Sequence, residues 1–232
     1  MALKKKSTED VTLDGVKICV YGIAGSGKTT LCATARNAIM LSAEAGLLSI
    51  KGMGRRMDYY EIQSYEDLQE AYDLVIDSEY ETICLDSLTE IAERILAEEK
   101  QLQKDARQAY GIMQDKCRNL VRAFRDIKGK NVVFVCKQER IQNEQNALIY
   151  SPSVPSKALP QEIPYFFDEV FAMRIIKNPD TQESYRVVQT QPYDGYDGKD
   201  RSNKLEVWEE PDLQKILDKI KGVDNGIETT ST

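Results

Sequence analysis

The feature that most constrains this chain is the run GIAGSGKT at Gly22–Thr29. An apolar segment, Val16–Tyr21, precedes it and is typical of a short buried strand, and Lys28–Asn37 follows with helical spacing. Glycine at Gly22 and Gly27 lets main-chain N–H groups point inward. This strand–loop–helix unit therefore predicts a cup for phosphate oxygens at the start of the helix.

The polar residues of this loop have predicted roles at a nucleoside triphosphate. Lys28 should reach the β- and γ-phosphates, and the Thr29 hydroxyl should coordinate Mg²⁺. Asp86 ends the apolar segment Thr82–Leu85, where a carboxylate can hold the magnesium ion through water. The residues expected to contact the nucleotide are Gly22, Ile23, Ala24, Gly25, Ser26, Gly27, Lys28, Thr29 and Thr30.

Hydrolysis also needs a group that orients or deprotonates water. Glu44 follows the predicted strand Ala38–Ser42, so it should stand at the same sheet edge as the phosphates. An ordinary exposed carboxylate is the alternative interpretation of Glu44, and the residues alone leave both open.

Strands and helices alternate along the chain, which predicts an α/β fold with a mainly parallel sheet covered on both faces. Expected strands are 16–21, 38–42, 59–62, 82–85, 131–136, 170–176 and 185–190, the last two forming a C-terminal antiparallel pair. Expected helices are 28–37, 65–76, 88–104, 112–127 and 212–221. We divide the chain into an N-terminal segment (1–15), one domain (16–221) and a polar, disordered tail (222–232). Residues 141–164 hold four prolines and predict a long loop that is functional or mobile.

Composition excludes several functions. The chain has no histidine and five cysteines without a C-x-x-C pair, which excludes imidazole-dependent triads and most zinc sites. It has no apolar run long enough to cross a membrane and no signal-peptide pattern, so we expect a cytoplasmic protein without a membrane partner. The net charge of −7 argues mildly against nucleic-acid binding. Yet residues 100–140 hold 11 basic and 4 acidic residues, a local surface for anionic ligands.

Three segments resemble the RecA/RadA recombinase core. Ser42–Gly46 resembles the segment that carries that superfamily's catalytic glutamate, here Glu44. Leu85–Thr89 resembles its Walker B strand, and Val133–Gln138 resembles the strand whose final glutamine senses the γ-phosphate. The resemblance implies a RecA-like P-loop core, ATP as the nucleotide, and Gln138 as the sensor.

Over Val16–Leu217 the chain is similar to short phage RecA-like ATPases, the AAA-labelled phage nucleotide-binding proteins that include Sak-type single-strand annealing recombinases. Ser151–Ile175 and Gly195–Glu206 carry this similarity in the second half. It implies a Mg²⁺-dependent, DNA-stimulated ATPase that binds single-stranded DNA and promotes phage recombination by annealing in the host cytoplasm. Implied partners are further copies of the chain, in a ring or filament, and a single-stranded-DNA-binding protein.

The same resemblance places DNA at the segment that follows Gln138. Lys137, Arg140 and Lys157 border that segment and supply cations, and Tyr150 is a candidate for base stacking or a loop anchor. In RecA-like ATPases a cation from the neighbouring subunit often completes the phosphate site. Such a cation is the predicted role of Lys199 or Arg201, although both can equally be charges of a solvated turn.

Besides a DNA-binding ATPase, two other functions stay open. One is a P-loop ATPase that acts as an assembly or regulatory switch on a protein partner and does not touch DNA. The acidic net charge favours this function. The other, a small-molecule kinase, fits the sequence less well, because no segment of the sequence resembles an acceptor-binding insert or an arginine-rich lid.

Overall fold

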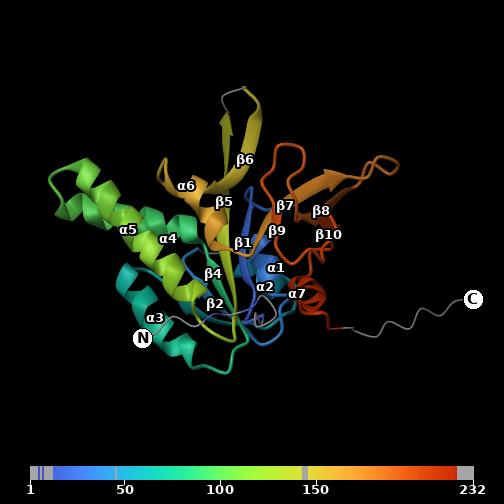
Figure 1. Ribbon diagram of the computed structural model, residues 1–232, viewed down its shortest axis with the longest axis horizontal. Helices are drawn as coiled ribbons and strands as arrows, with labels where there is room; N and C mark the ends of the chain where they lie inside the picture. Colours follow the sequence, from blue (N-terminus) through green and yellow to red (C-terminus); the bar gives the residue numbers. More distant parts are fainter. Residues whose placement is uncertain (1–4, 6, 8–12, 45, 143–145, 224–232) are drawn as a thin grey trace, which may run out of the picture.

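One sheet organises the protein, and its spatial order differs from the chain order (Figure 1). The structure, a computed structural model, describes residues 5, 7, 13–44, 46–142 and 146–223. From one edge to the other the main path runs β10-β8-β7-β1-β5-β4-β2-β3, with β6 paired to β5 and β9 to β7. The strands are β1 (Lys17–Gly22), β2 (Ala38–Ser42), β3 (Asp58–Glu61), β4 (Thr82–Asp86), β5 (Asn131–Gln142), β6 (Leu148–Ser153), β7 (Glu169–Lys177), β8 (Ser184–Gln189), β9 (Lys199–Asp200) and β10 (Trp208–Glu209).

Six strands, β1 to β5 and β7, run parallel, while β6, β8, β9 and β10 are antiparallel to their neighbours. Parallel strands end at one common edge, so segments that follow β1, β2, β4 and β5 meet there. In register, Ser42 lies beside Asp86, and Gly22 lies beside Lys137. The predicted α/β fold, a mainly parallel sheet with helices on both faces and a C-terminal antiparallel extension, is confirmed.

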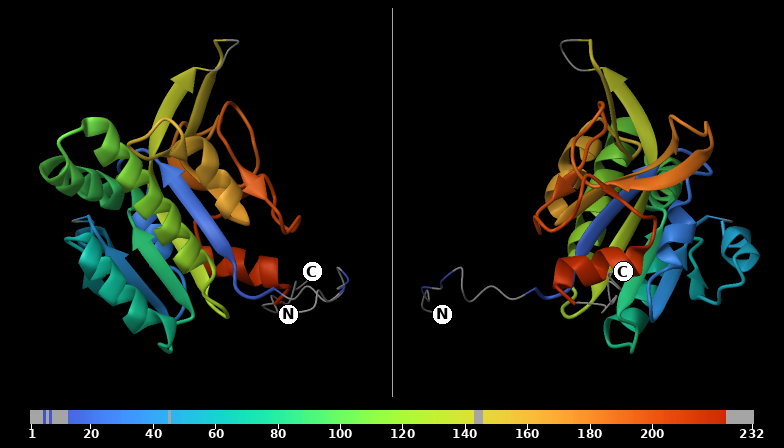
Figure 2. Two further views of the ribbon diagram at one scale, coloured as in Figure 1. Left: turned by 60° about the vertical axis from the view of Figure 1, so that its left-hand side comes forward. Right: turned by 90° about the vertical axis from the view of Figure 1, so that its right-hand side faces the viewer.

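Helices cover both faces of the sheet, as the views of Figures 1 and 2 show. Successive strand residues point to opposite faces, and they build two separate cores. Cys19 and Tyr21 of β1 pack toward α3 to α6, while Ile18 and Val20 pack toward α1, α2 and α7. The helices are α1 (Lys28–Cys32), α2 (Leu48–Gly52), α3 (Tyr65–Ile76), α4 (Leu88–Leu102), α5 (Ala106–Arg125), α6 (Leu159–Phe166) and α7 (Leu213–Lys221).

Local sequence signals account for most of these helix boundaries. A capping box begins α3, because Ser64 accepts from the Asp67 N–H and the Asp67 carboxylate accepts from the Ser64 N–H. The helix expected over 28–37 is shorter, since α1 ends at Cys32 and Asn37 has a left-handed φ of 43°. Helix α5 begins earlier than its apolar spacing indicated, where the Asp105 side chain caps the first turn.

The prediction of a long loop over 141–164 is wrong. Strand β5 continues to Gln142 and forms a hairpin with β6, and α6 follows, although residues 143–145 lie outside the described part. Two of the four prolines fall where a strand or a helix tolerates them. Pro152 lies in β6, which pairs with β5, and Pro160 lies in the first turn of α6, whereas Pro164 lies inside that helix. A count of prolines therefore does not exclude regular structure.

The predicted N-terminal segment and C-terminal tail fall mostly on residues outside the described part, and their predicted character stays a prediction. Within the described ranges, no helix combines the length and the apolar composition needed to cross a membrane.

Glu169, at the start of β7, is a buried carboxylate far from the phosphate loop in the register of β1 and β7. Its side chain is 1% exposed and accepts from the Ser202 N–H at 3.2 Å. Burial, with added repulsion from Asp200, raises the pKa of Glu169 to about 8 from the ordinary 4.5. The folded protein therefore keeps a proton that the unfolded chain loses near pH 4.5.

This pKa predicts a stability change with pH. Between pH 5 and 8 the unfolded chain binds fewer protons at this site, so the free energy of unfolding should fall as pH rises. Glu169→Gln should remove that decrease. Its free energy of unfolding relative to the wild type should therefore rise by about 2–4 kcal/mol between pH 5 and pH 8.5. Urea unfolding at both pH values measures the gain, with exposed Glu183→Gln as the control. Equal gains at both pH values would contradict the prediction.

Candidate nucleotide and catalytic site

The loop after β1 forms a cup only because two positions lack a side chain. A Cβ on Gly22 would lie 2.7 Å from the Met173 carbonyl oxygen and from the Ser26 hydroxyl. Gly27 has a φ of 101°, which side chains rarely adopt, and directly precedes α1. The Ser26 hydroxyl is buried and lacks a hydrogen-bond partner among the described residues. An unpartnered polar atom in the loop fits a site that takes a polar ligand.

Lys28 lies against this loop. Its Nζ donates to the carbonyl oxygens of Gly22 at 2.9 Å and Ile23 at 3.0 Å. Burial lowers the pKa of Lys28, and the nearby carboxylates Asp86 and Glu44 counteract the decrease. The ammonium group is thus held at the cup by neutral oxygens, and its charge is available to an anion.

Thr29 and Asp86 meet across two elements. The Thr29 hydroxyl, in the first turn of α1, donates to Asp86 Oδ2 at 2.6 Å. Asp86 ends β4 and is 2% exposed, and burial raises its pKa to about 6 while the Thr29 hydrogen bond counteracts the rise. Two hard oxygen donors side by side fit Mg²⁺, which usually takes one or two protein ligands plus phosphate oxygens. No cluster of three or more candidate metal ligands occurs among the described residues, so such an ion would also need oxygens from the nucleotide or water.

Glu44 is held next to the same strand end. The Ser87 hydroxyl donates to Glu44 Oε1 at 2.5 Å and accepts from the Glu90 N–H, which caps α4. The peptide bond between Asp86 and Ser87 is cis. Ser87 was not among the predicted site residues, although a serine directly before a helix is a recognisable capping signal. The structure therefore brings Lys28, Thr29, Asp86 and Glu44 together, and their catalytic roles stay predictions.

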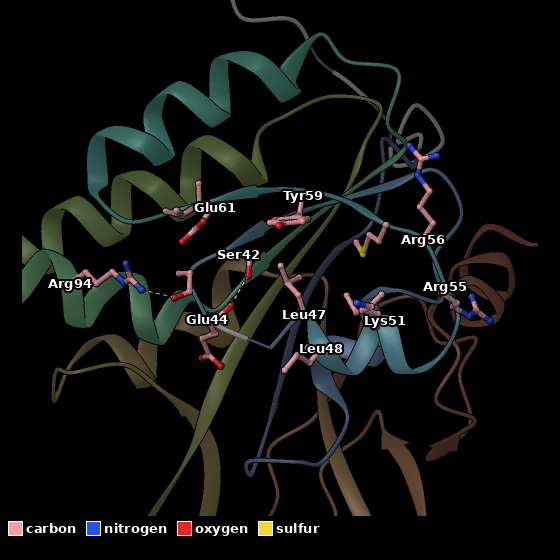
Figure 3. A pocket seen from close by; sticks show the side chains of 14 residues that line it. Ser42, Glu44, Leu47, Leu48, Lys51, Arg55, Arg56, Tyr59, Glu61 and Arg94 are labelled. Atoms are coloured by element: carbon pink, nitrogen blue, oxygen red, sulfur yellow. Dashed lines mark hydrogen bonds between the residues drawn. The ribbon is translucent and has the colours of Figure 1, made fainter.

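A cavity of about 690 Å³ opens beside Glu44 and is lined by residues of β2, α2 and β3 (Figure 3). Arg94 of α4 supports its wall, since Nη2 donates to the Ala43 carbonyl at 2.7 Å and Nη1 to the Gln63 carbonyl at 3.2 Å. These bonds fix the main chain directly before Glu44. Arg94 therefore positions the segment that carries the predicted catalytic carboxylate.

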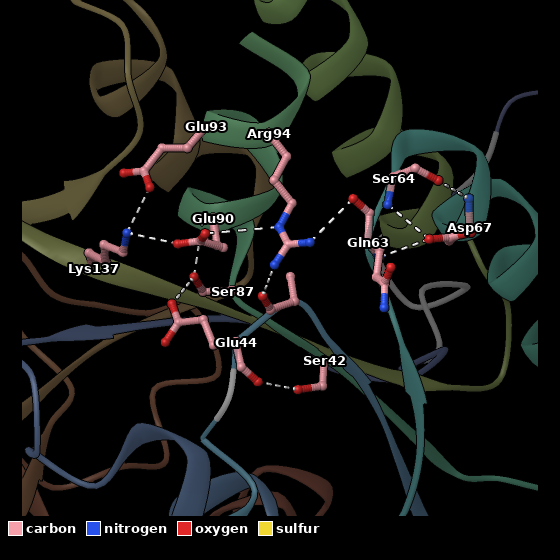
Figure 4. A network of polar contacts seen from close by, with 11 residues as sticks. Ser42, Glu44, Gln63, Ser64, Asp67, Ser87, Glu90, Glu93, Arg94 and Lys137 are labelled. Atoms are coloured by element: carbon pink, nitrogen blue, oxygen red, sulfur yellow. Dashed lines mark hydrogen bonds and ion pairs between the residues drawn. The ribbon is translucent and has the colours of Figure 1, made fainter. Parts of the chain in front are cut away.

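Gln138 lies on β5, one residue beyond the position level with Gly22. Lys137 next to it is not a free cation, because Nζ donates to Glu90 at 3.0 Å and Glu93 at 2.8 Å (Figure 4). Thr89 ties the base of the hairpin to α4, since its hydroxyl accepts from the Lys137 N–H and donates to the Ser153 carbonyl. The first turn of α4 thus contacts Glu44 through Ser87 and the hairpin through Thr89.

The other predicted DNA-binding residues lie on and beside this hairpin. Arg140 is exposed on β5, opposite Tyr150 on β6, and Lys157 is exposed before α6. The Tyr150 ring stacks on Tyr196 at 4.3 Å, and the main chain of Tyr150 bonds with the segment around Tyr196. Tyr150 therefore lies as the loop-anchor interpretation predicted, with one ring face already covered.

Lys199 and Arg201 do not lie in the phosphate site of their own chain. Lys199 Nζ donates to the carbonyl oxygens of Pro164 and Phe167, at 3.0 and 2.6 Å, and so caps the end of α6. Arg201 pairs at 3.0 Å with Asp168, which also accepts from the Lys17 N–H at the opposite end of β1. Lys199 is thus a structural anchor here, and any action of either cation on a neighbouring subunit stays a prediction.

The sequence reasoning missed Arg186. This β8 residue lies 161 positions from Gly25 in the chain, yet its Nη2 donates to the Gly25 carbonyl oxygen at 3.4 Å. No local motif marks it, because only the pairing of β8 with β7 brings it to the loop.

Comparison with known proteins gave one family match and a similar solved structure. A protein-family model described as AAA domain matches residues 14–202. A KaiC-like protein from the hyperthermophilic archaeon Pyrococcus horikoshii is similar in structure, with a TM-score of 0.42 and 14% identity over 78% of this chain and 80% of that chain. No curated protein matches the chain significantly.

The cup predicts a specific loss on removing Lys28. Lys28→Ala should weaken binding of a fluorescent ATP analogue at least about 100-fold, because a charge-assisted contact to phosphate is lost. The exposed Lys128, beyond α5, gives a matched control as Lys128→Ala. Fluorescence titration measures both, and circular dichroism verifies the fold. Wild-type affinity in Lys28→Ala would remove the cup from nucleotide binding.

Proposed function

The chain belongs to the AAA-domain family of P-loop ATPases, and we propose that it binds ATP with Mg²⁺ and hydrolyses it. The observation that carries the proposal is the 2.6 Å contact between Thr29 and Asp86, with the charges of Lys28 and Glu44 close to the Asp86 carboxylate. A phosphate cup, a pair of oxygen donors and a carboxylate at one sheet edge supply what phosphoryl transfer to water requires.

Each residue has a distinct task in this proposal. Main-chain N–H groups of the loop and the Lys28 ammonium hold the phosphates and stabilise the charge that builds during transfer. Thr29 and Asp86 would hold Mg²⁺, which neutralises phosphate charge when bound. Glu44, oriented by the Ser87 hydroxyl, positions a water molecule and accepts its proton. Gln138 would sense the γ-phosphate from the neighbouring strand end.

This assignment separates binding from turnover. Glu44→Gln should keep ATP affinity within about threefold and lower the hydrolysis rate about 10²–10⁴-fold, because only the proton acceptor is removed. Phosphate release measures turnover, and a titration with the ATP analogue measures affinity. Exposed Glu70→Gln on α3 is the control. Unchanged turnover in Glu44→Gln would remove Glu44 from the reaction.

We further propose that single-stranded DNA binds along the β5–β6 hairpin, which stands out from the body in Figures 1 and 2. Arg140 and Lys157 place exposed cations there, as non-specific binding to a phosphate backbone requires. The hairpin base and Glu44 both bond to the first turn of α4, so nucleotide state can alter DNA affinity.

In this role the protein would assemble with further copies as a ring or filament. It would act with a single-stranded-DNA-binding protein and promote annealing during phage recombination in the host cytoplasm.

Two observations favour the alternative, a nucleotide-dependent switch on a protein partner. Lys137, a predicted DNA contact, is engaged by Glu90 and Glu93, and the chain carries a net charge of −7. An acidic protein with few free cations at the hairpin suits a protein ligand as well as a polyanion.

DNA-dependent activity separates the two functions. With single-stranded oligonucleotide we expect stimulated hydrolysis and an affinity that falls between 50 and 200 mM salt. The Arg140→Ala/Lys157→Ala double variant should weaken binding about tenfold and reduce the salt dependence, whereas Lys177→Ala/Lys221→Ala, two exposed residues with equal charge change, should not. Fluorescence anisotropy and phosphate release measure these effects. Intact hydrolysis without DNA binding at 50 mM salt would leave the switch.

A further inference from the structure

Arg186 lies across the phosphate loop, and the loop is shaped to receive it. Its Nη2 reaches the Gly25 carbonyl oxygen at 3.4 Å. A Cβ built on Gly27 would lie 2.9 Å from Arg186 Cδ and 3.2 Å from its Nε. The stem of the arginine therefore occupies space that only glycine leaves open, and the guanidinium lies on the loop itself.

The charge of Arg186 is not neutralised by a carboxylate. Other arginines of the fold have ion pairs, such as Arg118 with Glu162 and Arg174 with Asp194. Within the described ranges Arg186 has no such pair, and its hydrogen bond goes to a neutral carbonyl. A guanidinium has five N–H donors, so most of its donors remain available to a ligand.

Sheet order decides which part of a triphosphate Arg186 can meet. The strand ends that carry Asp86 and Glu44 lie on the β5 side of β1, whereas β7 and β8 lie on the other side. Arg186 shares a strand face with Val188, which packs in the same core as Leu31 of α1. The γ-phosphate must lie toward Asp86 and Glu44 for hydrolysis, so the α- and β-phosphates lie toward Arg186.

We propose that Arg186 binds the α- and β-phosphate oxygens of the nucleotide, in the same chain that supplies the loop. The inference rests on the proposed ATPase function and adds a nucleotide-binding residue from the antiparallel extension. Because ADP and ATP share these two phosphates, Arg186 should strengthen the binding of both alike. A lysine in place of Arg186 keeps the positive charge and should retain part of this added affinity, whereas an uncharged side chain should retain none of it.

The test compares arginine, methionine and lysine at position 186 in the full chain. Arg186→Met keeps the apolar stem on Gly27, and Arg186→Lys keeps the positive charge. As the control, Arg107→Ala removes one exposed positive charge elsewhere. Isothermal titration with ADP and with a non-hydrolysable ATP analogue, both with Mg²⁺, gives the affinities. We expect Arg186→Met to weaken both about 10- to 100-fold and by the same factor, Arg186→Lys to weaken both less, and Arg107→Ala to change neither.

Each other result overturns the inference in a recognisable way. Wild-type affinities in Arg186→Met would show that the arginine only packs on the loop. A loss confined to the ATP analogue would place the guanidinium at the γ-phosphate. If neither the wild type nor Lys28→Ala bound either nucleotide, both the inference about Arg186 and the proposed ATPase function would fail. Thermal unfolding of the nucleotide-free variants checks that folding is retained.

Discussion

The hydrogen bond between Thr29 and Asp86 is the interaction on which the site depends, because it joins two elements separated by another strand of the sheet. Thr29 lies in the first turn of the helix after β1, and Asp86 ends β4, with β5 between the two strands. Together with the charge of Lys28, the bond offsets part of the desolvation of a buried carboxylate. Lys28 and Glu44 lie close to this contact, so a small shift of β4 against β1 would separate the two groups proposed to hold Mg²⁺.

The first turn of α4 extends this arrangement outward. Ser87 both caps the helix and holds Glu44, while Thr89 two residues later bonds to both strands of the β5–β6 hairpin. Glu90 of the same turn accepts from Lys137. One rigid helix terminus therefore contacts the predicted catalytic carboxylate and the predicted DNA-binding segment. Such a terminus can transmit a change at one contact to the other without a large rearrangement.

The positions of several residues could not be predicted from the sequence, and the physical reason is the same for each. Lys199 and Arg201 were grouped as neighbours in a turn, yet one anchors α6 and the other pairs with Asp168. Arg186 showed no motif, and only the β7–β8 pairing carries it to the loop. The composition of 141–164 predicts a loop, yet pairing of β6 with β5 and packing of α6 into the core give the segment regular structure. In each case a long-range contact outweighed local composition.

The sequence by itself determined the strand–loop–helix unit, the alternation of elements and the candidacy of Lys28, Thr29, Asp86 and Glu44. These follow from backbone requirements and periodicity, which act over a few residues. Only the tertiary structure decided that Thr29 touches Asp86, that Ser87 holds Glu44, that Lys137 is neutralised and that Arg186 reaches the loop. Those contacts depend on strand order and register, and local residue preferences carry no information about either.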